Sequence, residues 1–111
     1  MKIVAVTACP TGVAHTYMAK AALEKGAKRR GHSIKVETQG AMGIENEITK
    51  ADLEQADVVI LAIETAINKM DRFKGYNVMK VTINQVIGKN DEIFEKLEKA
   101  VEKSKEESDL L

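Results

Sequence analysis

The single cysteine of the sequence, Cys9, lies in a segment that could hold and transfer an anionic group. Residues 8–16 read ACPTGVAHT and lead into a predicted helix. The unpaired amides and the dipole of a helix N-terminus favour thiolate and phosphate. Pro10 biases Cys9 toward extended backbone, and Gly12 permits a tight turn. The segment predicts a nucleophilic cysteine beside a phosphate-binding loop formed by Thr11, Gly12, Val13, Ala14, His15 and Thr16.

Other chemistries compete for this loop. A lone cysteine is more often a small buried apolar residue, but the position of Cys9 beside proline, glycine and threonine favours a nucleophile. A nucleotide P-loop needs lysine followed by serine or threonine after its last glycine, and a thioredoxin-type pair needs a second cysteine. Small cytoplasmic cysteine phosphatases carry arginine where this chain has His15. The loop favours holding a phosphoryl group over hydrolysing it, and a phosphatase remains the alternative enzyme.

Composition limits the function classes. The 111 residues are 44% hydrophobic and 31% charged, which indicates one globular domain. Seventeen basic and seventeen acidic residues give no net charge, which argues against nucleic acid as a partner. One cysteine and two histidines argue against a metal site. Since no apolar run reaches the ~18 residues of a membrane span, we expect a soluble, cytoplasmic domain.

Four strands are expected. Residues 3–6 and 58–63 are apolar on both faces, as in parallel strands covered on both sides. Residues 34–38 alternate between apolar and charged side chains, which predicts a half-exposed strand at a sheet edge. Residues 78–82 form the fourth strand, and the glycines at 40 and 43 bracket a loop.

Helices are expected between these strands. An apolar stripe from Ala14 to Ala22 predicts a first helix that ends at Gly31, with a basic last turn at 28–30. Thr49 is the expected N-cap of a short helix to about Gln55, with a capping box. Asn90 is expected to start a last helix as its side-chain cap, followed by the acidic Asp91 and Glu92. Residues 64–75 are less regular, with room for one or two helical turns.

This alternation predicts an α/β fold in which a doubly wound, four-stranded parallel sheet of order 2-1-3-4 has helices on both faces, as in Rossmann-like or flavodoxin-like domains. The domain spans 1–103, and 104–111 form a charged, frayed tail. Ligands of such sheets bind where the winding reverses, here at the loops after Thr7 and Ile63. Glu64 falls there, but a carboxylate would repel phosphocysteine, so we do not expect it in the site.

A specific resemblance adds to this interpretation. The segment 9–19, CPTGVAHTYMA, resembles the phosphorylation-site signature of the fructose-family enzyme IIB of the bacterial phosphoenolpyruvate-dependent sugar phosphotransferase system. The similarity continues through 36–40 and 56–60 to the arginine, phenylalanine and glycine of 72–75, and covers about residues 2–101. Glu64 departs from the pattern, which has aspartate there. Since the chain has one domain, IIA and IIC units would be separate proteins.

The resemblance implies a phosphocysteine carrier. Cys9 would take a phosphoryl group from a phosphohistidine of IIA and pass it to a sugar, fructose or similar, held by membrane-embedded IIC. No metal or cofactor is implied, and the protein would visit the inner face of the membrane through IIC. A phosphate-responsive regulatory module on the same fold is an alternative from another class.

Neighbouring residues carry weaker expectations. His15 could donate to the phosphate or pack locally, Thr11 is favoured as a phosphate ligand, and Thr16 could be a ligand or a capping hydroxyl. Tyr17 and Met18 lie on the apolar stripe and are expected in the core. His32 follows a helix end and is expected at the solvated surface.

Overall fold

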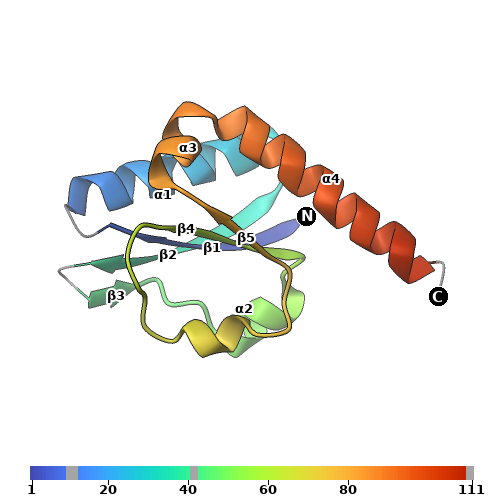
Figure 1. Cartoon of the computed structure of the whole chain (residues 1–111), viewed down its shortest axis with the longest axis horizontal. Coiled ribbons are helices and arrows are strands. Elements are labelled where there is room, and N and C mark those ends of the chain that lie inside the picture. Colours follow the sequence, from blue (N-terminus) through green and yellow to red (C-terminus); the bar gives the residue numbers. More distant parts are fainter. Residues whose placement is uncertain (10–12, 41–42, 110–111) are drawn as a thin grey trace.

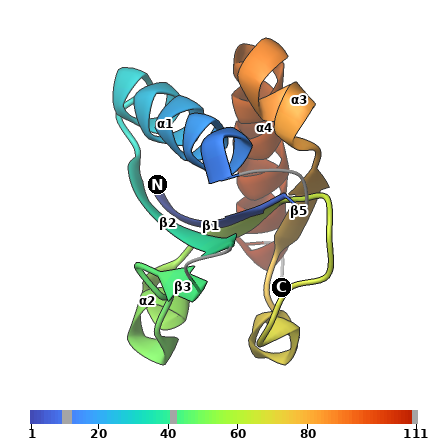
Figure 2. The ribbon, with the colours of Figure 1, turned by 90° about the vertical axis from the view of Figure 1, so that its left-hand side faces the viewer.

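The computed structural model describes residues 1–9, 13–40 and 43–109 of the chain, with the side chains of 13 and 103–109 outside the description. It has three layers, with α1, α3 and α4 on one face of the sheet and α2 and η1 on the other (Figures 1 and 2). The elements in chain order are β1 (Lys2–Ala8), α1 (Val13–Arg29), β2 (Ser33–Gly40), β3 (Gly43–Glu45), α2 (Lys50–Gln55), β4 (Val58–Ile63), the 3-10 helix η1 (Met70–Phe73), β5 (Val78–Val81), α3 (Ile83–Gly88) and α4 (Asn90–Asp109).

The sheet has five strands in the order β3-β2-β1-β4-β5, so the predicted count of four is wrong. The four expected strands pair in parallel and in the expected relative order. The additional strand, β3, pairs antiparallel to β2 and makes the sheet mixed. Strand β3 has only three residues, too few to show an alternating pattern in the sequence. It starts at Gly43, whose φ of +85° is a conformation that favours glycine.

Strand β2 lies inside the sheet, between β1 and β3, and the prediction of an edge strand is wrong. Its alternating charged residues are not all solvated. Glu37 is fully buried, and its carboxylate accepts hydrogen bonds from Arg72 of η1 at 2.8 and 2.5 Å. A charged side chain can therefore face inward on β2 because a partner distant in the sequence compensates its charge.

Apolar side chains fill both spaces between the layers. The α1 side of the sheet holds the larger core, and the α2 side holds the smaller one. The larger core includes Ile3, Ala5, Ala19, Leu23, Ala27, Val36, Ile60, Ile83, Phe94 and Leu97. The smaller core consists of Val4, Val6, Ile48, Leu53, Val59, Leu61 and Phe73. Strands β1 and β4 supply residues to both, which explains their continuous apolar runs.

Side-chain caps begin the short helices. The predicted capping box of Thr49 at the start of α2 is confirmed. A second capping box, between Thr82 and Gln85, starts α3, a helix that the sequence interpretation missed. Asn90 does not cap α4: its amide donates to the carbonyls of Ala22 and Val86 and so ties α4 to α1 and α3. The backbone of α4 is helical through residue 109, beyond the expected tail boundary at 104.

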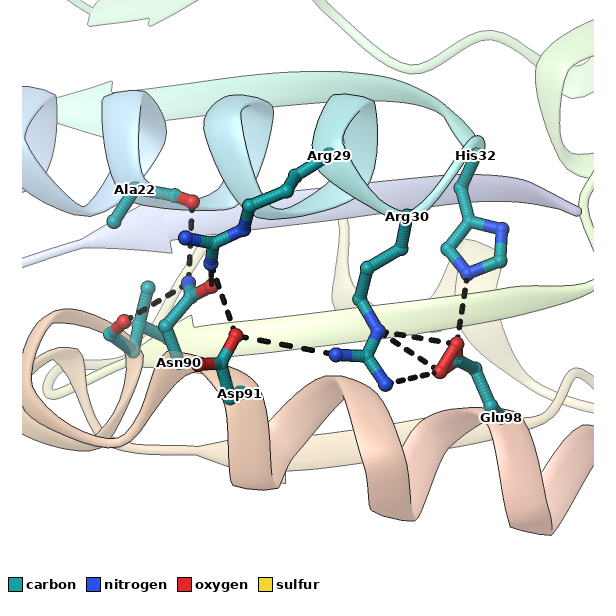
Figure 3. A network of polar contacts seen from close by, with 8 residues as sticks. Ala22, Arg29, Arg30, His32, Asn90, Asp91 and Glu98 are labelled. Atoms are coloured by element: carbon teal, nitrogen blue, oxygen red, sulfur yellow. Dashed lines mark hydrogen bonds and ion pairs between the residues drawn. The ribbon is translucent and has the colours of Figure 1, made fainter.

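A polar network joins the C-terminal end of α1 to α4 (Figure 3). Arg29 pairs with Asp91 at 3.0 Å, and Arg30 pairs with Glu98 at 2.7 Å. His32 contacts the same Glu98 at 3.2 Å and stacks on the ring of Phe94, so its expected place in solvent is wrong. Gly31 ends α1 with φ of +76°, as expected. None of the helices in the described ranges is long and apolar enough to cross a membrane.

Candidate active site

Cys9 follows the last residue of β1 and precedes α1, so it lies at the end of the sheet where the parallel strands have their carboxyl termini. Its side chain is 9% exposed and packs on the α1 side of the sheet. The helix that follows is 17 residues long, so its amino-terminal amides and dipole face this end of β1. Of the predicted phosphate loop, Thr11 and Gly12 lie outside the described residues, and Val13 is the first residue of α1.

The pairing of β1 with β4 brings Glu64 to Cys9. The register aligns Ala8 with Ile63, and the Glu64 amide donates to the Ala8 carbonyl at 3.0 Å. The Cys9 thiol donates a hydrogen bond to Oε2 of Glu64, with Sγ 3.8 Å from that oxygen. The sequence argument against Glu64 considers phosphocysteine only. In the unphosphorylated protein the thiol is a donor and the carboxylate is an acceptor, so the contact is favourable.

The first turn of α1 has both exposed and buried residues. Ala14 and His15 are exposed, whereas Thr16 is 3% exposed. The Thr16 carbonyl accepts a hydrogen bond from the Thr7 hydroxyl at 3.3 Å. Among residues 1–9, 13–40 and 43–109, the Thr16 hydroxyl has no hydrogen-bond partner, although a buried hydroxyl normally has one. His15 is thus open to solvent or a partner, and the described part of the chain leaves the buried Thr16 hydroxyl available as a donor.

Two further residues of α1 differ from expectation. Met18 is 51% exposed, so its predicted place in the core is wrong. The stripe of α1 that faces the sheet is instead formed by Thr16, Ala19, Leu23 and Ala27. The half-buried Tyr17 donates its hydroxyl to Glu45 of β3, and this hydrogen bond raises the pKa of Tyr17. Three of these four residues are small, and Leu23 is the large side chain that the stripe buries.

Gln39 fixes the segment that follows Glu64. Its side-chain amide accepts from the Asn68 backbone amide at 2.8 Å and donates to the Asn68 carbonyl at 3.1 Å. The span from Ile63 to Asn68 is thus held at both ends, by the sheet and by Gln39. It borders an open pocket of about 460 Å³, with Glu64, Thr65 and Lys80 among its polar lining residues and Ile63, Ile67 and Met70 among its apolar ones.

The buried carboxylate of Glu37 is stabilised in its charged form by its hydrogen-bond partners. Burial alone would raise the pKa of Glu37, but hydrogen bonds from Arg72, Gln39 and the Ile48 amide outweigh it and lower the pKa. Arg72 is therefore engaged in an ion pair with Glu37. Arg29 and Arg30, the only other arginines of the sequence, are paired with α4. The described residues place no arginine where a cysteine phosphatase needs one.

The arrangement supports transfer chemistry at sulfur. A buried thiol stands at a helix N-terminus, with an exposed histidine on the first turn and an open pocket beside it. Phosphoryl transfer depends mainly on positioning and charge stabilisation, which a helix N-terminus supplies. Within 1–9, 13–40 and 43–109, no cluster of three or more histidine, cysteine or acidic side chains could hold a metal ion.

Comparison with known proteins agrees with this chemistry. The family model described as "PTS system, Lactose/Cellobiose specific IIB subunit" matches residues 4–99. The "PTS system fructose-like EIIB component 2" of Escherichia coli strain K12 is 50% identical over 97 residues, which are 87% of this chain and 92% of that protein. The "PTS system fructose-specific EIIABC component" of Bacillus subtilis strain 168 is 46% identical over 95 residues, which are 86% of this chain and 15% of that protein.

A solved structure supports the same assignment. The solution structure of the Enzyme IIB subunit of the PTS system from Escherichia coli K12 superposes with a TM-score of 0.86 at 35% identity, covering 94% of this chain and 96% of that one. The family model names lactose and cellobiose, whereas these curated relatives are named for fructose. The chain belongs to the fructose-family IIB components of the sugar phosphotransferase system, which are phosphotransferases that carry a phosphoryl group in sugar uptake.

Proposed function

We propose that Cys9 is the residue that carries the phosphoryl group, taken from a phosphohistidine of a IIA protein and passed to a fructose-like sugar bound by a IIC protein. The observation that carries the proposal is the place of Cys9, at the carboxyl end of β1 and directly before α1. Parallel sheets bind ligands at this edge, where the winding reverses between β1 and β4.

Each transfer is an in-line displacement. The Cys9 thiolate attacks phosphorus, the phosphorus–nitrogen bond of phosphohistidine breaks, and its electron pair returns to the imidazole. In the second transfer a sugar hydroxyl oxygen attacks phosphorus and gives its proton to solvent, and the electron pair of the phosphorus–sulfur bond returns to Cys9. The amides that begin α1 would stabilise the equatorial oxygens in both steps. We assign the phosphate-binding loop to Thr11, Gly12, Val13, Ala14, His15 and Thr16.

The arginine pairs support a carrier over a phosphatase. Hydrolysis by a cysteine phosphatase uses an arginine at the position of His15, and the three arginines of this chain are engaged in ion pairs with Asp91, Glu98 and Glu37. A phosphoryl group on Cys9 would therefore persist until an acceptor arrives.

The partners follow from the relatives. The Bacillus subtilis relative is named an EIIABC component, so its name joins A, B and C units. We propose that this chain works with the corresponding A and C units, and that it acts on the cytoplasmic side of the membrane where the C unit presents the sugar.

One experiment tests the carrier residue. The general phosphotransferase proteins, a fructose-type IIA and phosphoenolpyruvate should together add one phosphoryl group to the protein, detected by intact-mass spectrometry. Peptide mapping should place it on Cys9, and Cys9→Ser should gain no phosphoryl group and lose onward transfer. Undiminished modification of the serine variant at another residue would remove Cys9 from this role.

A second experiment separates the carrier from its alternatives. Phosphorylated protein should lose its label slowly in buffer and quickly with membranes that contain a fructose-type IIC and its sugar, with sugar phosphate as the product. Equally rapid loss without membranes, with release of inorganic phosphate, would support a phosphatase. Slow loss with every IIC and sugar offered would support a regulatory module.

A further inference from the structure

Glu64 places a carboxylate beside the sulfur that is to carry a doubly charged group. The contact between Cys9 Sγ and Glu64 Oε2, at 3.8 Å, arises from strand pairing. Ala8 and Ile63 are register partners, and the Glu64 amide is bonded to the Ala8 carbonyl. Because the sheet holds both backbones, the carboxylate stays within side-chain reach of the sulfur.

No ion pair in the described part of the chain compensates the charge of Glu64. Other acidic residues hold a basic group closely: Asp52 pairs with Lys35 and Glu98 with Arg30, each at 2.7 Å. Over the described ranges no ion pair includes Glu64, although Lys80 lines the same pocket. Among the described residues, the hydrogen bond from the Cys9 thiol is the side-chain contact that the carboxylate makes.

We propose that Glu64 is a catalytic residue that sets the phosphoryl-transfer equilibrium of Cys9, by stabilising the empty thiol and destabilising phosphocysteine. This inference rests on the proposed carrier function of Cys9. The thiol has a proton to donate to the carboxylate, whereas phosphocysteine has none on sulfur and adds a phosphoryl group with nearly two negative charges. The contact therefore changes from attractive to repulsive when the group arrives.

The effect of Glu64 on transfer to the sugar follows from the change in charge during that transfer. The sugar oxygen forms its bond to phosphorus, the phosphorus–sulfur bond breaks, and the sulfur leaves as thiolate, while the sugar proton goes to solvent. Negative charge beside Glu64 falls in this step. When the thiolate then takes a proton from water, the hydrogen bond to Glu64 forms again. Glu64 thus favours donation to the sugar and opposes retention of the phosphoryl group.

The test compares Glu64→Gln, which removes the charge, with Glu64→Asp, which keeps it. Glu54→Gln is the matched control, because Glu54 is an exposed glutamate on α2, across the sheet from Cys9. Labelled phosphoryl is equilibrated between a fructose-type IIA and each variant. We expect Glu64→Gln to shift the partition toward phosphocysteine by about three- to tenfold, the size of a charge interaction across about 4 Å when water screens it. Glu64→Asp and Glu54→Gln should stay near wild type.

A partition that is unchanged in Glu64→Gln, or shifted toward IIA, would overturn the proposal. Salt gives a check on the unaltered chain: raising ionic strength from about 0.02 to 0.5 M should move the wild-type partition toward phosphocysteine relative to Glu64→Gln, because screening weakens the repulsion. An equal salt response of the two proteins would contradict the proposed repulsion.

A partner-free measurement separates the failure of this proposal from failure of the carrier function. Iodoacetamide is uncharged and reacts with the thiolate form of Cys9, whose sulfur lies 3.8 Å from the Glu64 carboxylate. Alkylation of Cys9 at pH 7 should be about three- to tenfold faster in Glu64→Gln than in wild type, and unchanged in Glu54→Gln. Faster alkylation without any phosphorylation of the wild type would reject the carrier function and keep the effect of Glu64 on sulfur. Equal alkylation rates would reject the role of Glu64.

Discussion

Arg72 and Glu37 form a buried ion pair that connects the turn before β5 to the middle of β2. The two guanidinium nitrogens of Arg72 donate to the two carboxylate oxygens at 2.8 and 2.5 Å. The Ile48 amide donates to the same carboxylate, and Arg72 donates in turn to the Ile48 carbonyl. With Gln39 on Asn68, this network holds the chain between β4 and β5 against the sheet, and so fixes the segment that begins at Glu64.

Removal of Arg72 should strongly destabilise the protein. Arg72→Leu leaves the Glu37 carboxylate buried without its counter-charge, and we expect the free energy of unfolding to fall by about 3–5 kcal/mol. Urea unfolding followed by circular dichroism measures it. Arg29→Leu is the control, because that arginine pairs with Asp91 at the exposed surface and should cost about 0–1 kcal/mol.

The double variant Glu37→Leu/Arg72→Leu tests the cause of this loss. Without either charge no desolvated carboxylate remains, so the double variant should be more stable than Arg72→Leu alone. If both are equally unstable, packing by the arginine stem rather than the unpaired charge accounts for the loss.

Stability should fall in acid through Asp52. A hydrogen bond from Lys35 and then the Thr49 amide lower the pKa of Asp52 from 3.8 to about 2. Because the folded pKa lies below the unfolded one, the carboxylate contributes stability above pH 4 and loses it as pH falls from about 4 to 2. Lys35→Met should flatten this part of the pH profile in urea unfolding. An unchanged loss between pH 4 and 2 in that variant would place the acid sensitivity elsewhere.

Much of the fold could be predicted because its signals are local. Continuous apolar runs identify β1 and β4, and Thr49 with Asp52 identifies the start of α2. The order of the strands then places Cys9 and the residue after Ile63 at one edge, as observed. The capping box of Thr82 and Gln85 is an equally local signal that indicates α3.

The features that could not be predicted from the sequence depend on contacts between segments distant in the chain. Lys35 and Glu37 alternate with apolar residues as on a solvated face, yet Glu37 is buried because Arg72 reaches it from 35 residues later. His32 follows a helix end, and only the packing of α4 gives it Glu98 as a partner. Met18 and Ala19 are neighbours on α1, and the sequence pattern alone does not show which of them faces the sheet.

Two glycines should respond oppositely to alanine. A Cβ at Gly26 of α1 would lie 2.4 Å from both Asn90 Oδ1 and Phe94 Cε2, where α4 packs closely on α1. Gly26→Ala should lower the free energy of unfolding by about 1–3 kcal/mol, because overpacking exceeds the gain in helix propensity. Gly88→Ala in α3 meets nothing within 4 Å and should be neutral or stabilising by up to about 1 kcal/mol. Thermal unfolding compares them; equal melting temperatures would mean that α4 moves aside without cost.

Thr7 of β1 and Thr16 on the buried face of α1 should differ in what their replacement does to stability and to phosphorylation. Thr7→Val removes the hydroxyl that donates to the Thr16 carbonyl and should cost about 0.5–1.5 kcal/mol. Thr16→Val replaces by a methyl group a buried hydroxyl that has no partner among the described residues, so it should leave stability unchanged or raise it by about 1 kcal/mol. Since the Cα–Cβ bonds of a helix tilt toward its N-terminus, we expect the Thr16 hydroxyl to reach toward the Cys9 end and to donate to a phosphoryl oxygen there. Thr16→Val should therefore reduce phosphocysteine several-fold, about the loss of one hydrogen bond, in the IIA partition assay. A loss of unfolding free energy in Thr16→Val equal to that in Thr7→Val would mean that the Thr16 hydroxyl has a partner in the folded protein. An unchanged phosphoryl partition in Thr16→Val would remove Thr16 from the phosphate-binding loop.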